Sequence, residues 1–407
     1  MNILSLLCCL SLTWAAAAGP EEPMDITSTS TAALAAPEAA TSSAPAASPA
    51  ADTPEAPARP EPPDWAKPIH GVHITGWVAG SAKNRRGLIR NIQAAGLNAV
   101  VIALKEYDGF MFVRDVKLSR ETGAFINAIP DLAACVRDFR EAGFYTIARI
   151  VLFKDNHLAR RRPDLAVRSS DGGIWSNANG VAWVDPYRHE IWEYNLDIAS
   201  RAATAGFDEI QFDYVRFPSD GNTRLCRYSR PDHTDKTANR SLKEFLTLAR
   251  QRLQPLGVKL SICVFGMTTS DDSGMGIGQH LQDLARQVDF VSPMMYPSHY
   301  SKGIYGLKNP NREPYKTILY GVRDAVARMG PDAWRLRPYF QDFSLGLRYR
   351  EDQVRAQIMA AAKQGVTSWI LWNPQNRYTW AALRHNNQPI HEFAAPAAQK
   401  NKEPAAK

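Results

Sequence analysis

Between residues 68 and 393 the chain alternates short, almost wholly apolar runs with longer stretches in which apolar side chains recur every three or four positions. The first pattern is typical of buried β-strands and the second of amphipathic α-helices. We expect eight strands, at 72–77, 99–104, 145–152, 207–213, 258–264, 289–296, 336–340 and 366–372.

The helical patterns lie between these strands, and Gly96, Gly143 and Gly206 follow three of them, as helix C-termini favour. Repeated strand–helix units predict parallel strands, and eight units predict a (β/α)₈ TIM barrel. A doubly wound open sheet is the alternative, but residues 76–80 (GWVAG) are not the phosphate loop that it would carry after its first strand. We expect helices at 87–95, 131–142, 188–205, 241–253, 277–286, 315–329 and 351–363.

Both ends of the chain have a different composition. Residues 1–18 combine an apolar run with four alanines, which is typical of a secretory signal peptide; an uncleaved anchor, a wrongly assigned start, or lipidation at Cys8 or Cys9 are the alternatives. Residues 19–67 and 394–407 contain almost no large apolar side chains, so we expect a disordered linker and a disordered tail around one domain at 68–393. The sequence therefore predicts an exported protein, located in the periplasm, at the cell envelope or in the medium.

Composition narrows the classes of function. The 407 residues are 45% hydrophobic and 22% charged, which is globular, and the five cysteines form neither a disulfide framework nor a zinc-type spacing. We expect no metal and no other cofactor. The basic run at 160–162 lies in a loop outside any recognisable nucleic-acid-binding module, so we expect no nucleic-acid partner. The oligomeric state stays open.

The positive charge is concentrated in the predicted domain. Residues 19–67 hold eight acidic and two basic side chains and residues 394–407 hold one acidic and three basic, so 68–393 carries +11 within a chain of net +7. Long-range attraction would favour an anionic glycan or peripheral association with an anionic envelope surface, and salt would weaken it.

Polar residues follow several predicted strands, and the C-terminal strand ends are where TIM barrels carry their functional groups. Asp213 ends the fourth strand, and two-residue periodicity places it on one face with Gln211 and Glu209. If the opposite, apolar face packs on the helices, this polar face points into the barrel with Asp213 uppermost. We predict a catalytic role for Asp213; capping a turn or pairing with Arg216 is the alternative.

Hydrolysis of a glycosidic bond needs a second carboxylate beside the first. Asp342 closes the seventh strand, and Glu106 and Asp108 follow the second; a role in a solvated turn is the alternative for each. Asp155 follows the third predicted strand, and the same two roles are open for it. Glu209 lies deeper, and we expect it to be the buried partner of a cation.

Aromatic side chains also collect near this rim, and aromatic faces can hold sugar rings. His73 and His157 are isolated in the sequence, so we expect hydrogen-bonded structural residues rather than ligands. We expect the substrate to be bound by Gln211, Tyr214, Arg216, Tyr296, His299, Trp372, Asn373 and Asp108.

Several of these stretches resemble one bacterial family whose domain, long labelled as of unknown function, is assigned to the glycoside hydrolases. Residues 207–218 (FDEIQFDYVRFP) carry the most distinctive match, and the matches together cover about 68–378. The others are 71–73 (GVH), 183–187 (WVDPY), 292–300 (SPMMYPSHY), 337–343 (RPYFQDF) and 369–374 (WILWNP).

The resemblance implies an alpha-amylase-like barrel, in which an Asp after strand four is the nucleophile, an acid follows strand five and an Asp follows strand seven. Asp213 and Asp342 match the first and last of these positions. The strand-five acid has no match, and Cys263 stands where relatives tend to carry Asp. Glu106 or Asp108 would then supply the proton.

We therefore predict a secreted glycoside hydrolase that cleaves a bacterial, and in view of its charge anionic, polysaccharide. The alternative is a catalytically silent barrel that binds cell-envelope polysaccharide. The hydrolase hypothesis requires a second carboxylate about 5 to 9.5 Å from that of Asp213.

Overall fold

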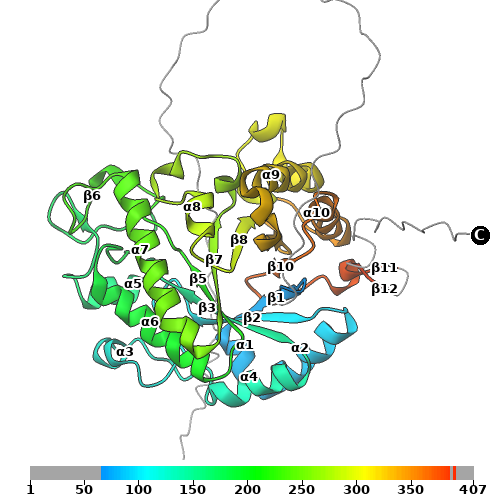
Figure 1. Ribbon diagram of the computed structural model, residues 1–407, viewed down its shortest axis with the longest axis horizontal. Coiled ribbons are helices and arrows are strands. Elements are labelled where there is room, and N and C mark those ends of the chain that lie inside the picture. The colour runs from blue at the N-terminus through cyan, green and yellow to red at the C-terminus, as the bar shows by residue number, and fades with distance from the viewer. Residues whose placement is uncertain (1–65, 386–387, 391–407) are drawn as a thin grey trace, which may run out of the picture.

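The computed structural model describes residues 66–385 and 388–390 (Figure 1). The predicted signal peptide, all but the last two residues of the predicted linker, and the predicted tail lie outside these residues. No helix among the described residues is both long enough and apolar enough to cross a membrane.

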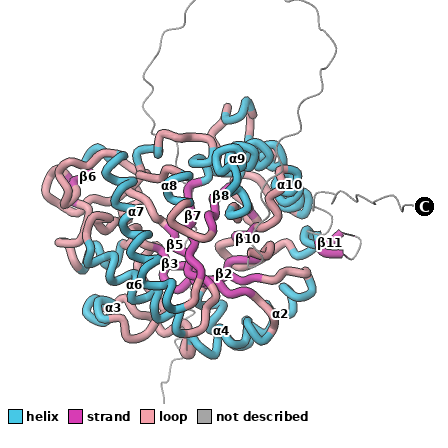
Figure 2. Tube along the Cα trace, in the orientation of Figure 1, coloured by secondary structure: helices cyan, strands magenta, loops and turns pink. Residues whose placement is uncertain are grey.

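Eight parallel strands form a closed barrel, as predicted, with helices around it (Figures 1 and 2). Around the barrel the strands follow the order β1-β10-β9-β8-β7-β5-β3-β2, so each pairs with its neighbours in the chain. They are β1 (His70–Ile74), β2 (Ala99–Lys105), β3 (Tyr145–Val151), β5 (Glu209–Asp213), β7 (Lys259–Phe265), β8 (Phe290–Met295), β9 (Tyr339–Gln341) and β10 (Trp369–Trp372).

The helices that cover the barrel agree with the sequence pattern, and short helices and strands are added in the loops. Two small antiparallel pairs, β4 (Arg168–Ser169) with β6 (Cys226–Arg227) and β11 (Arg384–His385) with β12 (Gln388–Pro389), lie outside the barrel. The α-helices are α1 (Gly76–Gly80), α2 (Ala82–Ala94), α3 (Lys117–Thr122), α4 (Leu132–Glu141), α5 (Asn156–Arg161), α6 (His189–Thr204), α7 (Asp235–Leu253), α8 (Leu281–Ala285), α9 (Pro314–Met329) and α10 (Glu351–Lys363).

Two predicted elements differ from the structure for local reasons. The first strand ends at Ile74 rather than at 77, because Thr75 caps α1 and its hydroxyl accepts a hydrogen bond from the Val78 amide. The helix predicted at 277–286 is reduced to α8. The turn before it has positive φ at Gly274, Met275, Gly276 and Gly278, which is incompatible with a continuous helix.

The two faces of each barrel strand separate apolar from polar side chains. On β5, Phe212 packs outward against Phe245 of α7, with ring centroids 5.2 Å apart. Inside the barrel, Glu209 accepts hydrogen bonds from Arg337 Nη1 at 2.9 Å and from the Tyr145 hydroxyl at 3.0 Å. The expected cation partner of Glu209 is therefore Arg337, and this ion pair is fully buried.

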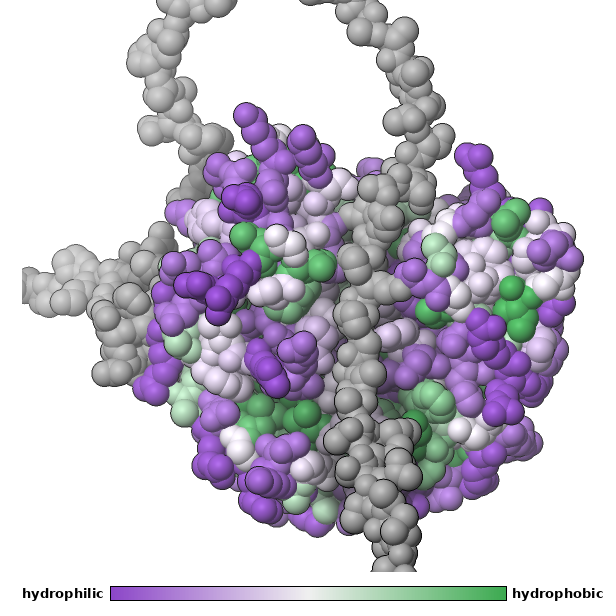
Figure 3. Space-filling view, turned by 180° about the vertical axis from the view of Figure 1, so that it is seen from behind, coloured by the Kyte–Doolittle hydropathy of each residue, from purple (hydrophilic) through white to green (hydrophobic). Residues whose placement is uncertain are grey.

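The surface is mainly hydrophilic or intermediate, with separate hydrophobic patches (Figure 3). Trp77 on α1 is the most exposed of the large hydrophobic side chains in the described part of the chain, at 53%. It directly follows the turn after β1, so it lies at the C-terminal end of the barrel, here called the mouth.

Candidate active site

Three charged side chains from neighbouring strands meet at the mouth. Arg149 of β3 donates from Nε to Asp213 Oδ2 at 2.8 Å, and its Nη2 lies 2.6 Å from the same oxygen. Arg149 Nη1 donates to Glu106 Oε2 at 3.1 Å. We call Glu106, Arg149 and Asp213 the Arg149 cluster.

Strand register explains why these three residues meet. Arg149 pairs with Gln211, and Val151 pairs with Asp213. Arg149 and Asp213 therefore both face the interior, and Asp213 lies two residues closer to the C-terminal ends of the strands. The register between β2 and β3 shifts between Ala103 and Lys105, just before Glu106. Asp213 is 1% exposed and Arg149 is 4% exposed, so their ion pair is shielded from water.

The shared guanidinium limits the distance between the two carboxylates. Both carboxylates contact nitrogens of one planar guanidinium, which places their contacting oxygens within about 8 Å of each other. Carboxyl separations of roughly 5 to 9.5 Å span the retaining and inverting glycosidases. The structure therefore brings together Asp213 and Glu106, two of the three carboxylates predicted to be catalytic.

Burial favours the protonated form of Glu106. It raises the pKa of this carboxyl, the neighbouring Asp108 and Asp213 carboxylates add to the effect, and Arg149 opposes it. A carboxyl group whose pKa burial raises is suited to be a general acid.

Asp342, the third predicted catalytic carboxylate, is engaged elsewhere. Oδ2 accepts a hydrogen bond from the Thr379 amide at 2.7 Å, and Oδ1 accepts one from the Thr379 hydroxyl at 2.6 Å. Asp342 follows β9. Strands β8 and β7 lie between β9 and β5 on one side of the barrel. In this position Asp342 fastens the loop after β10, and its catalytic role stays a prediction.

Asp342 should make stability depend on pH. Burial raises the pKa of this carboxyl from 3.8 to about 6, so the native state holds a proton that the unfolded state releases. Stability should therefore fall as the pH rises from about 4 to about 6, by roughly 1–3 kcal/mol from this group. Asp342→Asn should flatten that part of the curve in urea unfolding measured across the pH range.

Asp272 is exposed, so Asp272→Asn is the control for this measurement. We expect its stability to depend on pH as that of the wild type does. Coincident slopes for the wild type and Asp342→Asn between pH 4 and 6 would contradict the assignment to Asp342.

Predicted substrate residues at β8 and β10 form one aromatic group. Tyr296 and Trp372 stack with centroids 5.4 Å apart and planes 26° apart, and Phe343 meets both rings edge-on. The ring centroids of His299 and Tyr296 are 5.4 Å apart. Burial lowers the pKa of His299 to about 4, so its ring is neutral near pH 7. These contacts bring three of the predicted residues together beside the mouth.

A second group surrounds Tyr214, directly after Asp213. Tyr214 has a φ of +50°, a strained conformation for a residue with a side chain, and its amide donates to Asp213 Oδ1 at 2.6 Å. Arg216 lies 4.9 Å from the Tyr214 ring and 5.0 Å from that of Trp183. Arg149 thus pairs with Asp213, a role for which the sequence had offered Arg216.

The remaining predicted substrate residues lie in structural positions. Gln211 is fully buried in the barrel, where its side-chain oxygen accepts a hydrogen bond from the Tyr339 hydroxyl at 2.6 Å. Asn373 donates to the Asp342 carbonyl at 2.5 Å and accepts from the Gln375 amide at 2.8 Å. Asp108 is exposed and accepts from the Phe110 amide at 3.0 Å. The Gln211 and Asn373 positions fit support of the barrel and its turns better than contact with a sugar.

Asp155 and the last residue of β2 form a separate buried pair. Asp155 and Lys105 are fully buried, with 2.8 Å between Oδ2 and Nζ. Asp155 Oδ1 also accepts from the Leu158 amide and caps α5. Asp155 therefore stabilises the wall of the barrel.

Sequence reasoning missed Arg149, although two-residue alternation along YTIARIVL turns it to the same face as Tyr145 and Ile147. The prediction of a hydrogen-bonded His73 was also wrong. The His73 ring is 3% exposed, and neither ring nitrogen has a hydrogen-bond partner among the described residues, whereas sequence predicted a hydrogen-bonded histidine. Burial and the Arg149 charge lower the pKa of His73, so its ring is neutral.

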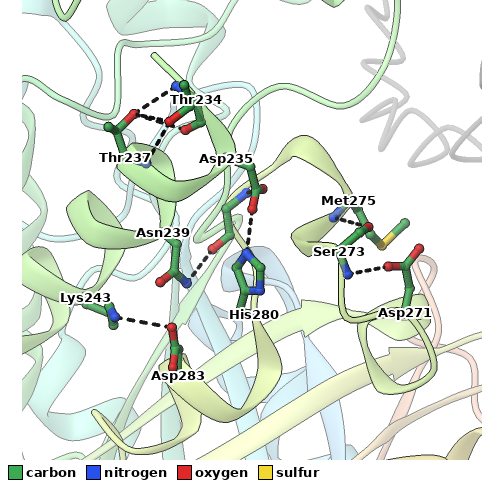
Figure 4. A network of polar contacts seen from close by, with 11 residues as sticks. Thr234, Asp235, Thr237, Asn239, Lys243, Asp271, Ser273, Met275, His280 and Asp283 are labelled. Carbon is green, nitrogen blue, oxygen red and sulfur yellow. Dashed lines mark hydrogen bonds and ion pairs between the residues drawn. The ribbon is translucent and has the colours of Figure 1, made fainter. Parts of the chain in front are cut away.

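The loop after β7, the fifth strand in sequence, is tied to α7 (Figure 4). Asp235 at the start of α7 lies 2.5 Å from His280 Nε2 and accepts from the Gly278 amide at 3.1 Å. Asp271 in the same loop accepts from the Ser273 amide at 2.7 Å. The first carboxylate after the fifth strand thus closes a local turn.

Within residues 66–385 and 388–390, no group of three or more His, Cys, Asp or Glu side chains is arranged to hold a metal ion.

Comparison with known proteins gives one family and one fold. Residues 71–378 match the family model described as "Putative glycosyl hydrolase domain". No curated protein sequence matches the chain. A hypothetical protein of Ruminiclostridium thermocellum shares 32% identity over 50% of this chain and 98% of its own, with a TM-score of 0.43.

Two other structures share the fold at low sequence identity. The PgaB (BpsB) glycoside hydrolase domain of Bordetella bronchiseptica has 13% identity and a TM-score of 0.58, over 82% of this chain and 100% of its own. Alpha-L-fucosidase isoenzyme 2 of Paenibacillus thiaminolyticus has 12% identity and a TM-score of 0.56, over 81% of this chain and 49% of its own.

Proposed function

Because the chain belongs to this glycosyl hydrolase domain family, we propose that it is an exported glycoside hydrolase that cleaves an anionic bacterial polysaccharide. The single observation that carries the proposal is the Arg149 cluster, in which two carboxylates share one guanidinium at the mouth of the barrel.

The two carboxylates take different roles in the proposed reaction. Asp213, held by Arg149 and by the Tyr214 amide, is the nucleophile or the base that activates water. Glu106, whose pKa burial raises, donates the proton to the leaving oxygen. Arg149 orients both groups and stabilises the negative charge on Asp213.

The aromatic group of Tyr296, His299, Phe343 and Trp372 lies at the same mouth, after strands β8, β9 and β10. Its partly exposed members, His299 and Phe343, offer a wall against which sugar rings pack. Asp342 is the alternative acid in the proposal, since its raised pKa of about 6 also suits proton donation.

The charge of the chain supports an anionic substrate, since 68–393 carries a formal +11. The signal-like residues 1–18 and the linker-like residues 19–67 support export to where envelope or secreted polysaccharides occur.

Release of reducing ends from a panel of polysaccharides tests the proposal. We expect the wild-type protein to act on anionic members, such as uronic-acid polymers, more than on neutral ones, and to lose rate as salt screens the attraction. Binding to one member without release of reducing ends from any member would instead identify a silent polysaccharide-binding barrel.

A further inference from the structure

Two exposed arginines, Arg168 and Arg227, lie on loop segments that follow β3 and β5 at the C-terminal end of the barrel. Segments 163–187 and 219–233 are joined by the two-stranded sheet of β4 and β6, and we call this unit the outcrop. Ser170 N donates to the Leu225 carbonyl at 2.9 Å, and Trp175 Nε1 donates to the Asn222 carbonyl at 3.1 Å. β6 lies at the upper left edge of Figure 1, away from the barrel axis.

The β4–β6 pair places two arginines directly opposite each other. Arg168 pairs with Arg227 across the antiparallel sheet, and both side chains are exposed. Cross-strand neighbours in an antiparallel pair lie close together, and like charges there are destabilising. The small sheet therefore carries a repulsion that a bound anion would relieve.

The two guanidinium groups contact carbonyl oxygens instead of carboxylates. Arg168 donates to the Pro163 and Gly172 carbonyls, and Arg227 Nη1 donates to the Arg224 and Cys226 carbonyls at 3.0 and 2.9 Å. Within the described residues, neither arginine forms an ion pair with an acidic side chain. Hydrogen bonds to carbonyls orient a guanidinium without neutralising its charge.

Acidic side chains of the outcrop hydrogen-bond to groups other than Arg168 and Arg227. Asp171 accepts from the Gly173 amide at 2.9 Å, and Asp220 accepts from Asn177 Nδ2 at 2.5 Å. By contrast, Arg230 of the same outcrop pairs with Asp232 at 2.8 Å. Arg168 and Arg227 thus differ from Arg230, which has a carboxylate partner.

The outcrop continues into the candidate active site. Trp183, at the base of the outcrop, packs edge-on against Tyr214 with centroids 5.8 Å apart, and Tyr214 directly follows Asp213. A chain lying across β4 and β6 could therefore extend toward the Arg149 cluster.

We propose that Arg168 and Arg227 form an auxiliary binding site for the acidic groups of an extended anionic polysaccharide, outside the catalytic mouth. This inference rests on the proposed function, and it names the substrate class as a polymer that carries carboxylate or other anionic groups along its length. Planar guanidinium groups match carboxylates in two-pronged hydrogen bonds. Leu225 beside them is 40% exposed and offers an apolar surface to a sugar face.

Binding of polygalacturonate to the full chain tests the site without relying on turnover. We expect Arg168→Gln/Arg227→Gln to weaken binding about five- to tenfold at low ionic strength in affinity electrophoresis, and the difference to shrink as salt is added. Thermal unfolding of the variant should be unchanged or shifted upward, because the like-charge repulsion is removed.

Arg86→Gln/Arg90→Gln is the matched control. These two arginines of α2 are exposed, and α2 lies at the lower right of Figure 1, across the molecule from β6. This variant loses the same charge and should bind polygalacturonate nearly as tightly as the wild type.

Three results would overturn the auxiliary site: no wild-type binding of polygalacturonate, equal loss in both double variants, or binding to neutral dextran that depends equally on Arg168 and Arg227. If vesicles of phosphatidylglycerol compete through the same arginines and polygalacturonate does not, the partner is a lipid surface and the glycan assignment fails. Arginine-dependent binding without release of reducing ends from any polysaccharide would refute the proposed hydrolysis alone.

Discussion

Asp213→Asn is expected to reduce the release of reducing ends from a polysaccharide cleaved by the wild type by about 10²- to 10⁴-fold, the usual contribution of a group that transfers a proton in catalysis. The substitution keeps the shape of the side chain and one acceptor oxygen, but removes the negative charge that Arg149 holds at 2.6–2.8 Å. Affinity for the polysaccharide should change much less than the rate, and a reducing-end assay beside a binding assay separates the two.

Asp271→Asn is the matched control for this experiment. Asp271 also follows a barrel strand at the mouth, but its carboxylate accepts a hydrogen bond from the Ser273 amide in a local turn. We expect the rate of this variant to stay within about twofold of the wild type, since Asn can serve the same turn. An Asp213→Asn variant as active as this control would remove Asp213 from the mechanism.

Arg149→Met is expected to destabilise the fold by about 3–5 kcal/mol, because it leaves the buried Asp213 carboxylate without its counter-ion. Glu106 loses the same partner at 3.1 Å. Chemical denaturation near neutral pH measures the loss, which should be smaller at acid pH, where the carboxylates can take up protons.

The double variant Arg149→Met/Asp213→Asn distinguishes a lost ion pair from lost packing. Removing the stranded charge should restore part of the stability, so the effects of the two single substitutions should not add. If the two single substitutions instead reduce the free energy of unfolding additively in the double variant, Arg149 and Asp213 are not energetically coupled.

The barrel follows from local patterns in the sequence. Two-residue alternation places Phe212 outward against α7 and Asp213 inward, and both assignments are confirmed. The differences arise where backbone geometry overrides hydropathy. Thr75 ends β1 early by capping α1, and the positive φ values from Gly274 to Gly278 shorten the helix predicted after the fifth strand.

The candidate site was only partly visible in the sequence. Asp213 and Glu106 were found because each directly follows or ends a strand, a property of the chain itself. Arg149, which joins them, was passed over because it stands in an apolar run. His73 shows the same limit, since the absence of partners for its ring nitrogens depends on which side chains the other strands bring beside it.

The sequence by itself thus determined the barrel, the mouth and the strand ends that carry carboxylates, because periodicity and strand order are local properties of the chain. Only the tertiary structure decided which carboxylates meet. Lateral register between β2, β3 and β5 brings Glu106 and Asp213 to one guanidinium, whereas Thr379, 37 residues further along the chain, engages Asp342. Contacts between such distant residues depend on how the strands close into a ring, and no local pattern encodes that.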